Sequence, residues 1–338
     1  MTSMQREREI TTTVDLCLPN GRLNPDAIGW TRRQLHNTDG IARGGYRWGR
    51  NKRWEYWGIT TPTHIVAITL SSIDYIALNY VWVFDRSTFE EIMYEEISPL
   101  GRGVTLPGTL SEGSASARVS KLALDIDEID GGTRLRAESP RVSVDIIAER
   151  IPGSEAMGVV VPWNDTTFQY TVKDVDRPAH GTITIDGTEF DVPRGSSWAI
   201  LDHGRGRWPY SLSWNWGAGS GIIDGHRVGV QFGGRWTVGT GSTENAIVVD
   251  GRVHKISEEL AWTWDSSNYL APWRIESERV DATFTPFYDR SSHTNLGVIA
   301  SSTHQCFGHY SGSVIDDSGT PISIDGILGW AEDVSNKW

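Results

Sequence analysis

Four Asp-Gly pairs, each placed between runs of alternating apolar and polar residues, constrain the fold of this chain most strongly. They occur at Asp130-Gly131, Asp186-Gly187, Asp224-Gly225 and Asp250-Gly251. Two-residue hairpin turns need positive φ angles, which Asp tolerates and Gly adopts freely. Alternation with a period of two is typical of strands that bury one face. The sequence therefore predicts a series of antiparallel β-hairpins.

Other segments extend this β pattern along the chain. Trp54 to Asp85 is rich in β-branched and aromatic residues, which predicts about three strands. Thr88 to Ile97 has mixed propensity and is assigned to an edge strand, and Asp317-Ser318-Gly319 marks a further hairpin. Closing such strands into barrels, or stacking them as sandwiches, removes exposed sheet edges. We therefore predict an all-β fold.

The N-terminal region predicts one short helix. Asn24 can cap free amides and Pro25 suits the first helical position, so a helix is expected over residues 27–35. The preceding residues 1–20 are expected to form an N-terminal arm.

A repeated aromatic motif suggests two related halves. Trp54-Glu55-Tyr56-Trp57-Gly58 resembles Trp214-Asn215-Trp216-Gly217. We predict two β-barrel-like units, residues 21–165 and 166–338. All 16 tryptophans lie at positions 30–82 or 163–338. A tryptophan-lined cavity would therefore combine the early strands with the second half.

Charge and composition exclude several classes of partner. Lys and Arg total 31 against 43 Asp and Glu, giving a net charge of −12 and a pI near 5.2. Binding to nucleic acid needs local positive charge, and no apolar run is long enough for a spanning helix. Two isolated cysteines and nine histidines without ligand spacing predict no metal site. We expect a cytoplasmic protein without membrane insertion or a cofactor, and with a small-molecule ligand.

The stretch from Ile200 to Gly221 holds the densest collection of titratable and aromatic residues. Asp202 and His203 are candidates for a general acid or base. Neighbouring residues on a strand point to opposite faces, so only one of the two is expected to face a cavity. The alternative is one buried, hydrogen-bonded residue beside one exposed residue. The glycines at 217–221 precede a hairpin and not a helix, which excludes a nucleotide loop.

Further residues of this stretch are candidates for ligand binding. Guanidinium groups beside an indole suit a carboxylate, a phosphate or cation–π packing, although they could equally pair with surface carboxylates. Two alternating indoles share one face and could stack on a ligand or fill the core. The candidates are Arg205, Arg207, Trp208, Tyr210, Trp214, Asn215 and Trp216.

Candidates outside this stretch complete the predicted site. Trp54, Glu55 and Trp57 come from the early aromatic motif. Glu244 and Glu332 could form the carboxylate pair of a glycosidase, which needs a separation of roughly 5 to 10 Å. Surface placement is the alternative for any single acidic residue.

Four motifs carry a resemblance to a known family. LDHGRGRWPY, WNWGAGSG, TENAIVVDGR and DGILGWAEDVSNKW resemble a bacterial family catalogued as domain of unknown function 2804. More remotely, the Asp-His and Trp-x-Trp-Gly pattern is similar to the two-barrel group of hydroxyneurosporene synthase, attachment-related proteins and fungal cyclases. That resemblance implies two lipocalin-like, calycin-type β-barrels or half-barrels around a hydrophobic ligand. The arginine-bearing insertion after Asp202-His203 departs from the hydratase signature.

Three functions follow as hypotheses. In the first, an enzyme of lyase, hydratase or isomerase type acts on a largely apolar molecule, with Asp202 or His203 as proton donor. Arg205 or Arg207 then holds a polar end of the substrate, and surrounding indoles raise the pKa of the acid. The second is a carrier or sensor with the same cavity, and the third is a carbohydrate hydrolase that uses Glu244 and Glu332.

Overall fold

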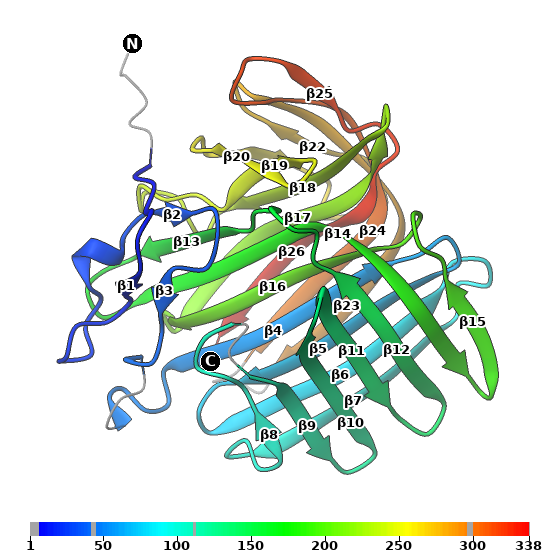
Figure 1. The fold of residues 1–338 in the computed structure, drawn as a ribbon, viewed down its shortest axis with the longest axis horizontal. Coiled ribbons are helices and arrows are strands. Elements are labelled where there is room, and N and C mark those ends of the chain that lie inside the picture. The colour runs from blue at the N-terminus through cyan, green and yellow to red at the C-terminus, as the bar shows by residue number, and fades with distance from the viewer. Residues whose placement is uncertain (1–6, 42–44, 111–112, 296–299, 338) are drawn as a thin grey trace.

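Two large antiparallel sheets make up most of the protein. The computed structural model describes residues 7–41, 45–110, 113–295 and 300–337. Within these residues the sheets contain 14 and 10 strands, and a short parallel pair joins β1 (Val14–Asp15) to β3 (His36–Asn37). One sheet lies above the other, with the N-terminal segment at one side (Figure 1). The all-β prediction is confirmed.

The first sheet curls into a nearly closed barrel. Its edges approach each other where the Lys121 amide donates to the Glu96 carboxylate at 3.4 Å. Across the sheet the strands are β7 (Glu91–Pro99), β6 (Ile76–Asp85), β5 (His64–Ser72), β4 (Asn51–Thr60), β16 (Trp198–Arg207), β14 (Phe168–Ile185), β12 (Val142–Glu149), β11 (Gly132–Glu138), β10 (Leu122–Ile129), β9 (Ala115–Val119) and β8 (Val104–Thr105), with β13 (Met157–Pro162) and β15 (Thr188–Val192) paired to β14 and β2 (Trp30–Thr31) paired to β13.

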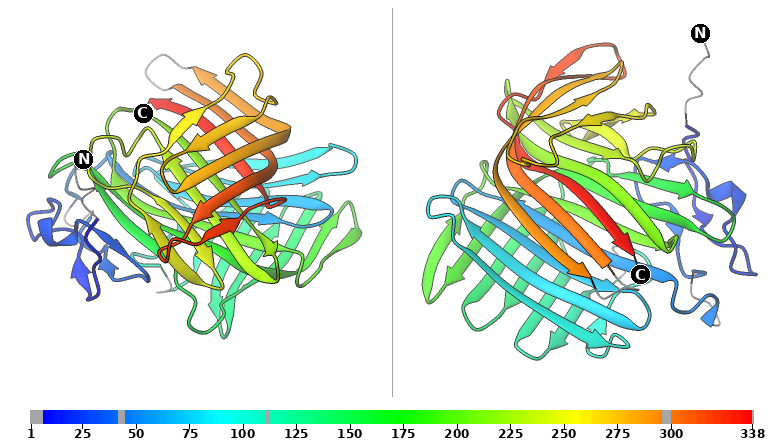
Figure 2. Two further views of the ribbon diagram at one scale, coloured as in Figure 1. Left: turned by 90° about the horizontal axis from the view of Figure 1, so that it is seen from above. Right: turned by 180° about the vertical axis from the view of Figure 1, so that it is seen from behind.

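The second sheet forms a half-barrel over the first. The two sheets are seen from above and from behind in Figure 2. Across it the strands are β20 (Arg252–Ile256), β19 (Asn245–Val249), β18 (His226–Gly234), β17 (Ser211–Ile223), β26 (Leu328–Lys337), β24 (Ala300–Ile315), β23 (Val280–Asn295), β22 (Trp273–Glu276) and β21 (Ala261–Thr263), with β25 (Pro321–Ser323) paired to β24. This half-barrel and the barrel together confirm the predicted two-unit architecture.

The Asp-Gly pairs form the turns that their sequence predicts. Asp186 and Gly187 have φ angles of 49° and 82°, and Asp224 and Gly225 have φ angles of 51° and 85°. The turns at 130–131 and 250–251 likewise join β10 to β11 and β19 to β20. The strands expected in Trp54 to Asp85 are β4, β5 and β6, and β7 is the predicted edge strand. Period-two alternation and turn chemistry were sufficient for these predictions.

The predicted helix over residues 27–35 is wrong. Asn24 does cap a turn, because its side chain accepts from the Asp26 amide, but only a 3-10 turn follows over Pro25–Ala27. Ile28 is already extended and Gly29 has a φ of 150°. Strand β2 then pairs with β13. Pairing with the sheet therefore overrides the local helix signal.

Three layers of buried apolar side chains stabilise the two sheets. Side chains such as Trp57, Ile68 and Leu201 fill the first barrel. Phe284, Tyr310 and neighbouring residues fill the concave side of the second sheet, where the predicted closing hairpin joins β24 to β25 through Gly319. A third layer lies between the sheets and includes many aromatic rings. Because side chains fill the interiors of the barrel and the half-barrel, a binding site is expected in the layer between the sheets.

The chain changes sheets within the stretch from 200 to 221. Strand β16 belongs to the first sheet and β17, which follows, belongs to the second. Residues 168–207, beyond the expected boundary at 165, therefore pair with the first unit. The predicted junction at 200–221 lies where the two sheets meet.

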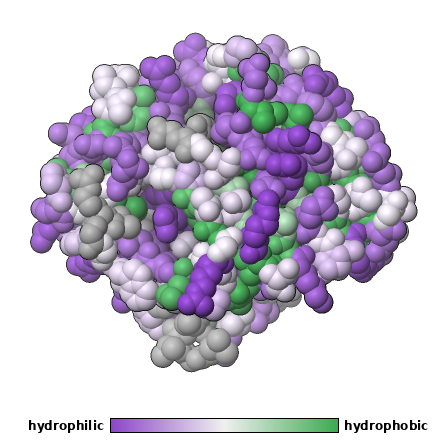
Figure 3. Space-filling view, turned by 60° about the horizontal axis from the view of Figure 1, so that its bottom comes forward, coloured by the Kyte–Doolittle hydropathy of each residue, from purple (hydrophilic) through white to green (hydrophobic). Residues whose placement is uncertain are grey.

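The outer surface mixes both kinds of side chain. On the face drawn in Figure 3, hydrophobic residues appear as separate patches among hydrophilic ones. Within the described residues, no helix has the length and apolar character needed to cross a membrane.

Candidate functional site

A cavity of about 530 Å³ lies between the two sheets. Strands β4 to β7, β14 and β16 contribute its walls from the barrel, and β17, β23, β24 and β26 contribute them from the half-barrel. Its size falls in the range of small-molecule sites. Aromatic lining residues are Trp54, Tyr56, Tyr80, Trp208, Trp214, Trp216 and Trp236. Ionisable lining residues are Lys52, Arg53, Glu91, Glu95, Lys173, Asp202, Glu244, Arg290 and Glu332.

Strand alternation separates Asp202 from His203. Asp202 lines the cavity. His203 points to the opposite face of β16, is fully buried, and has its Nδ1 3.6 Å from Glu55 Oε1. Burial, together with the charge of Arg205, lowers the pKa of His203 to about 4. Of the two predicted acid-base residues, only Asp202 can reach a molecule in this cavity.

Lys173 joins two carboxylates of the cavity. Its Nζ lies 3.0 Å from Asp202 Oδ2 and 3.2 Å from Glu244 Oε2. Burial acts to lower the pKa of Lys173, but the two carboxylates outweigh it and the pKa is raised. The ammonium also lies 4.3 Å from the centroid of the Trp216 ring. This arrangement holds Lys173 charged and fixes both carboxylates.

Strand pairing explains why Lys173 was missed from the sequence. Lys173 on β14 stands directly opposite Asp202 on β16. Its neighbours in the chain carry no motif, so only the register of the two strands could have identified it. The same holds for Gln305 on β24, which lies opposite Glu332 on β26.

Glu332 is the least typical carboxyl group of the site. Burial raises its pKa to about 7, although hydrogen bonds oppose the shift. Trp214 Nε1 donates to Oε2 at 3.3 Å, and Gln305 Nε2 donates to Oε1 at 2.7 Å. The Gln305 amide also lies 3.1 Å from the Tyr56 hydroxyl oxygen. Glu332 is therefore a carboxyl group that can carry a proton near neutral pH.

Indole rings form a continuous wall beside these groups. Trp208 packs edge-on against Trp54 at 5.2 Å and against Trp214 at 5.6 Å between ring centroids. Trp214 and Trp216 share one face of β17, as alternation predicts, and both border the cavity. Trp236 donates from Nε1 to Glu244 Oε1 at 2.6 Å. The wall thus supplies apolar area and also orients two carboxyl groups.

The predicted arginines turn away from the cavity. Arg205 and Arg207 are fully buried on the same face of β16 as His203. Arg205 donates to the Pro107 carbonyl at 2.7 Å, and Arg207 donates to the Gly21 carbonyl. The residues that alternate with them on the cavity face are Gly204 and Gly206, which leave room for the Trp54 ring and Gln169.

Four other candidates also lie outside the cavity lining. Glu55 is buried beside His203, and Trp57 lies in the core of the first barrel. Tyr210 is exposed. Asn215 is buried on the other face of β17 and donates to the Glu332 carbonyl at 3.0 Å. The structure instead adds Lys173, Gln305, Tyr56, Trp236 and Arg290 to the residues that face the cavity.

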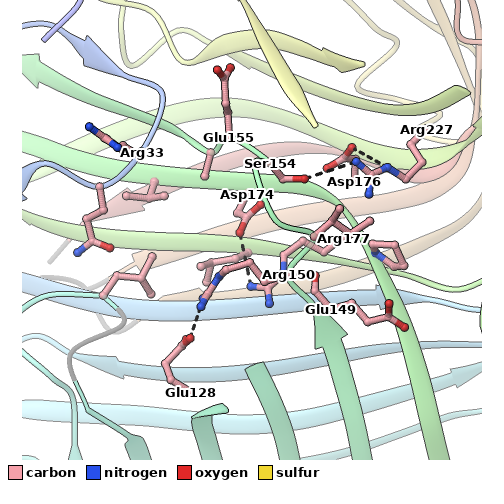
Figure 4. A pocket seen from close by; sticks show the side chains of 17 residues that line it. Arg33, Glu128, Glu149, Arg150, Ser154, Glu155, Asp174, Asp176, Arg177 and Arg227 are labelled. Carbon is pink, nitrogen blue, oxygen red and sulfur yellow. Dashed lines mark hydrogen bonds and ion pairs between the residues drawn. The ribbon is translucent and has the colours of Figure 1, made fainter. Parts of the chain in front are cut away.

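A smaller cavity of about 180 Å³ lies on the opposite side of β14 (Figure 4). A bulge between Asp174 and Arg177 bends the strand there. Two arginines are paired with carboxylates of β14: Arg177 lies 3.5 Å from Asp174, and Arg227 lies 3.6 Å from Asp176. Burial raises the pKa of Asp176 to about 7. These ion pairs anchor β14 and leave the larger cavity as the better candidate.

The fold and the position of the cavity define a class of protein. A nearly closed barrel and a half-barrel face each other, and the larger cavity lies between them. This is the lipocalin-like two-barrel architecture. Within that class the chain belongs to the family described as domain of unknown function (DUF2804), whose model matches residues 7–338.

Solved structures share the fold at low identity. The AttH-designated protein NE1406 from Nitrosomonas europaea has 14% identity and a TM-score of 0.51 over 84% of this chain and 92% of that chain. CghA has 10% identity and a TM-score of 0.50 over 85% and 88%. Kievitone hydratase from Nectria haematococca has 12% identity and a TM-score of 0.49 over 85% and 88%. A search of curated proteins gives no match.

Proposed function

We propose that this protein binds a small, largely apolar molecule between its two sheets and transforms it by proton transfer, as a lyase, hydratase or isomerase does. The observation that carries this proposal is the environment of Glu332. Its pKa is raised to about 7 by burial, and it faces a cavity lined by seven aromatic residues. A group that titrates near the working pH is well suited to general acid catalysis.

The other carboxylates have a different role in this proposal. Asp202 is paired with Lys173 at 3.0 Å and accepts from the Thr171 hydroxyl at 3.0 Å. Asp202 is thus the base and Glu332 the acid, which reverses the role of donor expected for Asp202 from the sequence. Two carboxyl groups whose environments differ in this way are a common basis for acid-base assignments.

The proposed isomerisation needs only these two groups and the substrate, and the hydration variant adds one water. Glu332 gives its proton to one carbon of a substrate double bond, and the adjacent carbon becomes electron-poor. Asp202 then removes a proton from a neighbouring carbon, which shifts the double bond. In the hydration variant, water attacks the electron-poor carbon and Asp202 accepts the proton of that water. Proton exchange with solvent restores both carboxyl groups.

The test uses an extract of small molecules from cells that make the protein. Wild type and Glu332→Gln are each incubated with the extract in deuterated water, and the products are compared by mass spectrometry. We expect a compound that wild type depletes and converts to a deuterium-labelled product, and that Glu332→Gln leaves unchanged. A molecule that binds and is recovered unlabelled from both proteins would instead establish the carrier or sensor function.

A carbohydrate hydrolase is a second candidate, because Glu244 and Glu332 line the same cavity. Both oxygens of Glu244 are already engaged, one by Trp236 at 2.6 Å and the other by Lys173 at 3.2 Å. Asp202 is engaged at both oxygens in the same way, so the ranking of proton transfer above hydrolysis rests on Glu332 and on the largely aromatic lining of the cavity. Release of a chromophore from nitrophenyl glycosides by wild type but not by Glu244→Gln would reverse that order.

A further inference from the structure

Arg290 is a cation of the main cavity that the proposed chemistry does not use. It lies on β23, and its guanidinium carbon is 4.6 Å from the Trp82 ring centroid and 5.0 Å from that of Tyr80. Its Nη1 donates to Gln305 Oε1 at 3.3 Å, and its Nη2 contacts the Met93 sulfur at 3.6 Å. Among the described residues, none places a carboxylate within ion-pair distance of it.

This setting differs from that of Lys173 in the same cavity. Lys173 has two carboxylate partners within 3.2 Å, so its charge is compensated. Arg290 contacts aromatic faces, an amide oxygen and a thioether instead, and its charge acts on the Glu95 carboxyl group from beyond ion-pair distance. A guanidinium offers a fork of donors that matches a carboxylate in two parallel hydrogen bonds. Its free donors therefore suit an anionic group of a ligand.

Gln305 connects Arg290 to the proposed acid. Its amide oxygen accepts from Arg290, and its amide nitrogen donates to Glu332 Oε1 at 2.7 Å. An anionic group bound at Arg290 would thus lie about one side chain away from Glu332. The remainder of the ligand would lie along the indole wall that begins at Trp214.

We propose that Arg290 binds a carboxylate of the substrate, so that the substrate is an apolar organic acid. This inference rests on the proposed function of the main cavity. A monoanion matches a single guanidinium. The carboxyl groups of Glu91, Glu95 and Glu332 also line the cavity and disfavour a doubly charged phosphate. Arg290 is thus a specificity-determining residue, the role expected from the sequence for Arg205 or Arg207.

Calorimetric titration with decanoate and decan-1-ol at neutral pH tests the inference. The two probes differ in the carboxylate and share an apolar chain. Wild type is expected to bind decanoate roughly ten- to a hundredfold more tightly, the usual effect of a charge-assisted hydrogen bond. Arg290→Gln is expected to lose this preference and to keep its affinity for decan-1-ol.

Arg274→Gln is the matched control, because it removes the same charge from an arginine of β22 that is paired with Glu276 on that strand and with Asp281 on β23. It should keep the preference for decanoate. Three results would overturn the role of Arg290 while the cavity function stands. They are equal affinities of wild type for the two probes, a preference for decanoate that survives in Arg290→Gln, and a preference for decanoate that disappears in Arg274→Gln. If wild type binds neither probe, both the role of Arg290 and the proposed function of the main cavity are overturned. Unchanged turnover in Glu332→Gln overturns the acid-base chemistry alone.

Discussion

Replacing Lys173 by methionine removes the cation that lies between two buried carboxylates of the cavity. At about 3 Å and an effective dielectric constant near 20, each contact has roughly 5 kcal/mol of Coulomb attraction, part of which offsets desolvation. In the structure the Lys173 ammonium lies 3.0 Å from Asp202 and 3.2 Å from Glu244. Breaking a buried pair by removing one partner typically costs about 3–5 kcal/mol. We therefore expect Lys173→Met to lower the free energy of unfolding by about 3–5 kcal/mol above neutral pH.

Urea unfolding followed by tryptophan fluorescence measures this loss. The slope of the free energy of unfolding against urea concentration should stay unchanged, because the surface exposed on unfolding is the same. Lowering the pH should narrow the difference from wild type, since protonation neutralises the unpaired carboxylates. Lys121→Met, an exposed position on the turn before β10, should change stability by no more than about 0.5 kcal/mol.

Two further results would decide whether the ion pair is the cause. Glu244→Gln in the Lys173→Met background should recover part of the lost stability, because one unpaired charge has been removed. A loss below about 1 kcal/mol for Lys173→Met, or a loss that is independent of pH, would refute the reasoning.

Three other substitutions test separate parts of the structure. As the pH rises from 4.5, the ordinary glutamate pKa, to about 7, wild-type stability should fall by up to about 3 kcal/mol, because the folded Glu332 holds its proton longer than the unfolded chain does. Glu332→Gln should flatten this fall in urea titrations, and wild-type activity should decline above about pH 7, where Glu332 loses its proton. Gly204→Ala should cost about 1–3 kcal/mol and change tryptophan fluorescence, since its methyl group would overlap the Trp54 ring; unchanged stability would contradict this packing. His203→Gln should lessen the loss of stability as pH falls from 6.5 towards 4, because the folded protein resists protonation of a histidine that the unfolded chain accepts; equal acid sensitivity of variant and wild type would show that other groups dominate.

Local patterns in the sequence were sufficient for the fold and for part of the site. Asp-Gly turns and alternation predicted the hairpins, and alternation also predicted that Asp202 and His203 face opposite ways. The sequence could not show which of them faces the cavity, because that depends on which side of β16 meets the second sheet. Arg205 and Arg207 share the face of His203, and Gly204 and Gly206 occupy the cavity face. The position of Lys173 depends on strand register.

The helix prediction failed for a related reason. Asn24 and Pro25 are strong local signals, but the pairing of β2 with β13 depends on residues far along the chain. Arg290 has no local signal at all. The pairing of β23 with β24 places it opposite Gln305, and the packing of the second sheet against the first brings it to Tyr80 on β6.

A site between two barrels lies outside the packed interior of either unit. The packed interiors, with Trp57 and Leu201 in one and Phe284 and Tyr310 in the other, hold each unit together. Side chains on the facing surfaces can therefore be exchanged during evolution with little effect on either interior. NE1406, at 14% identity, keeps the same architecture over 84% of this chain. Such a scaffold can acquire new ligands by exchanging residues of its facing surfaces while both barrel interiors are preserved.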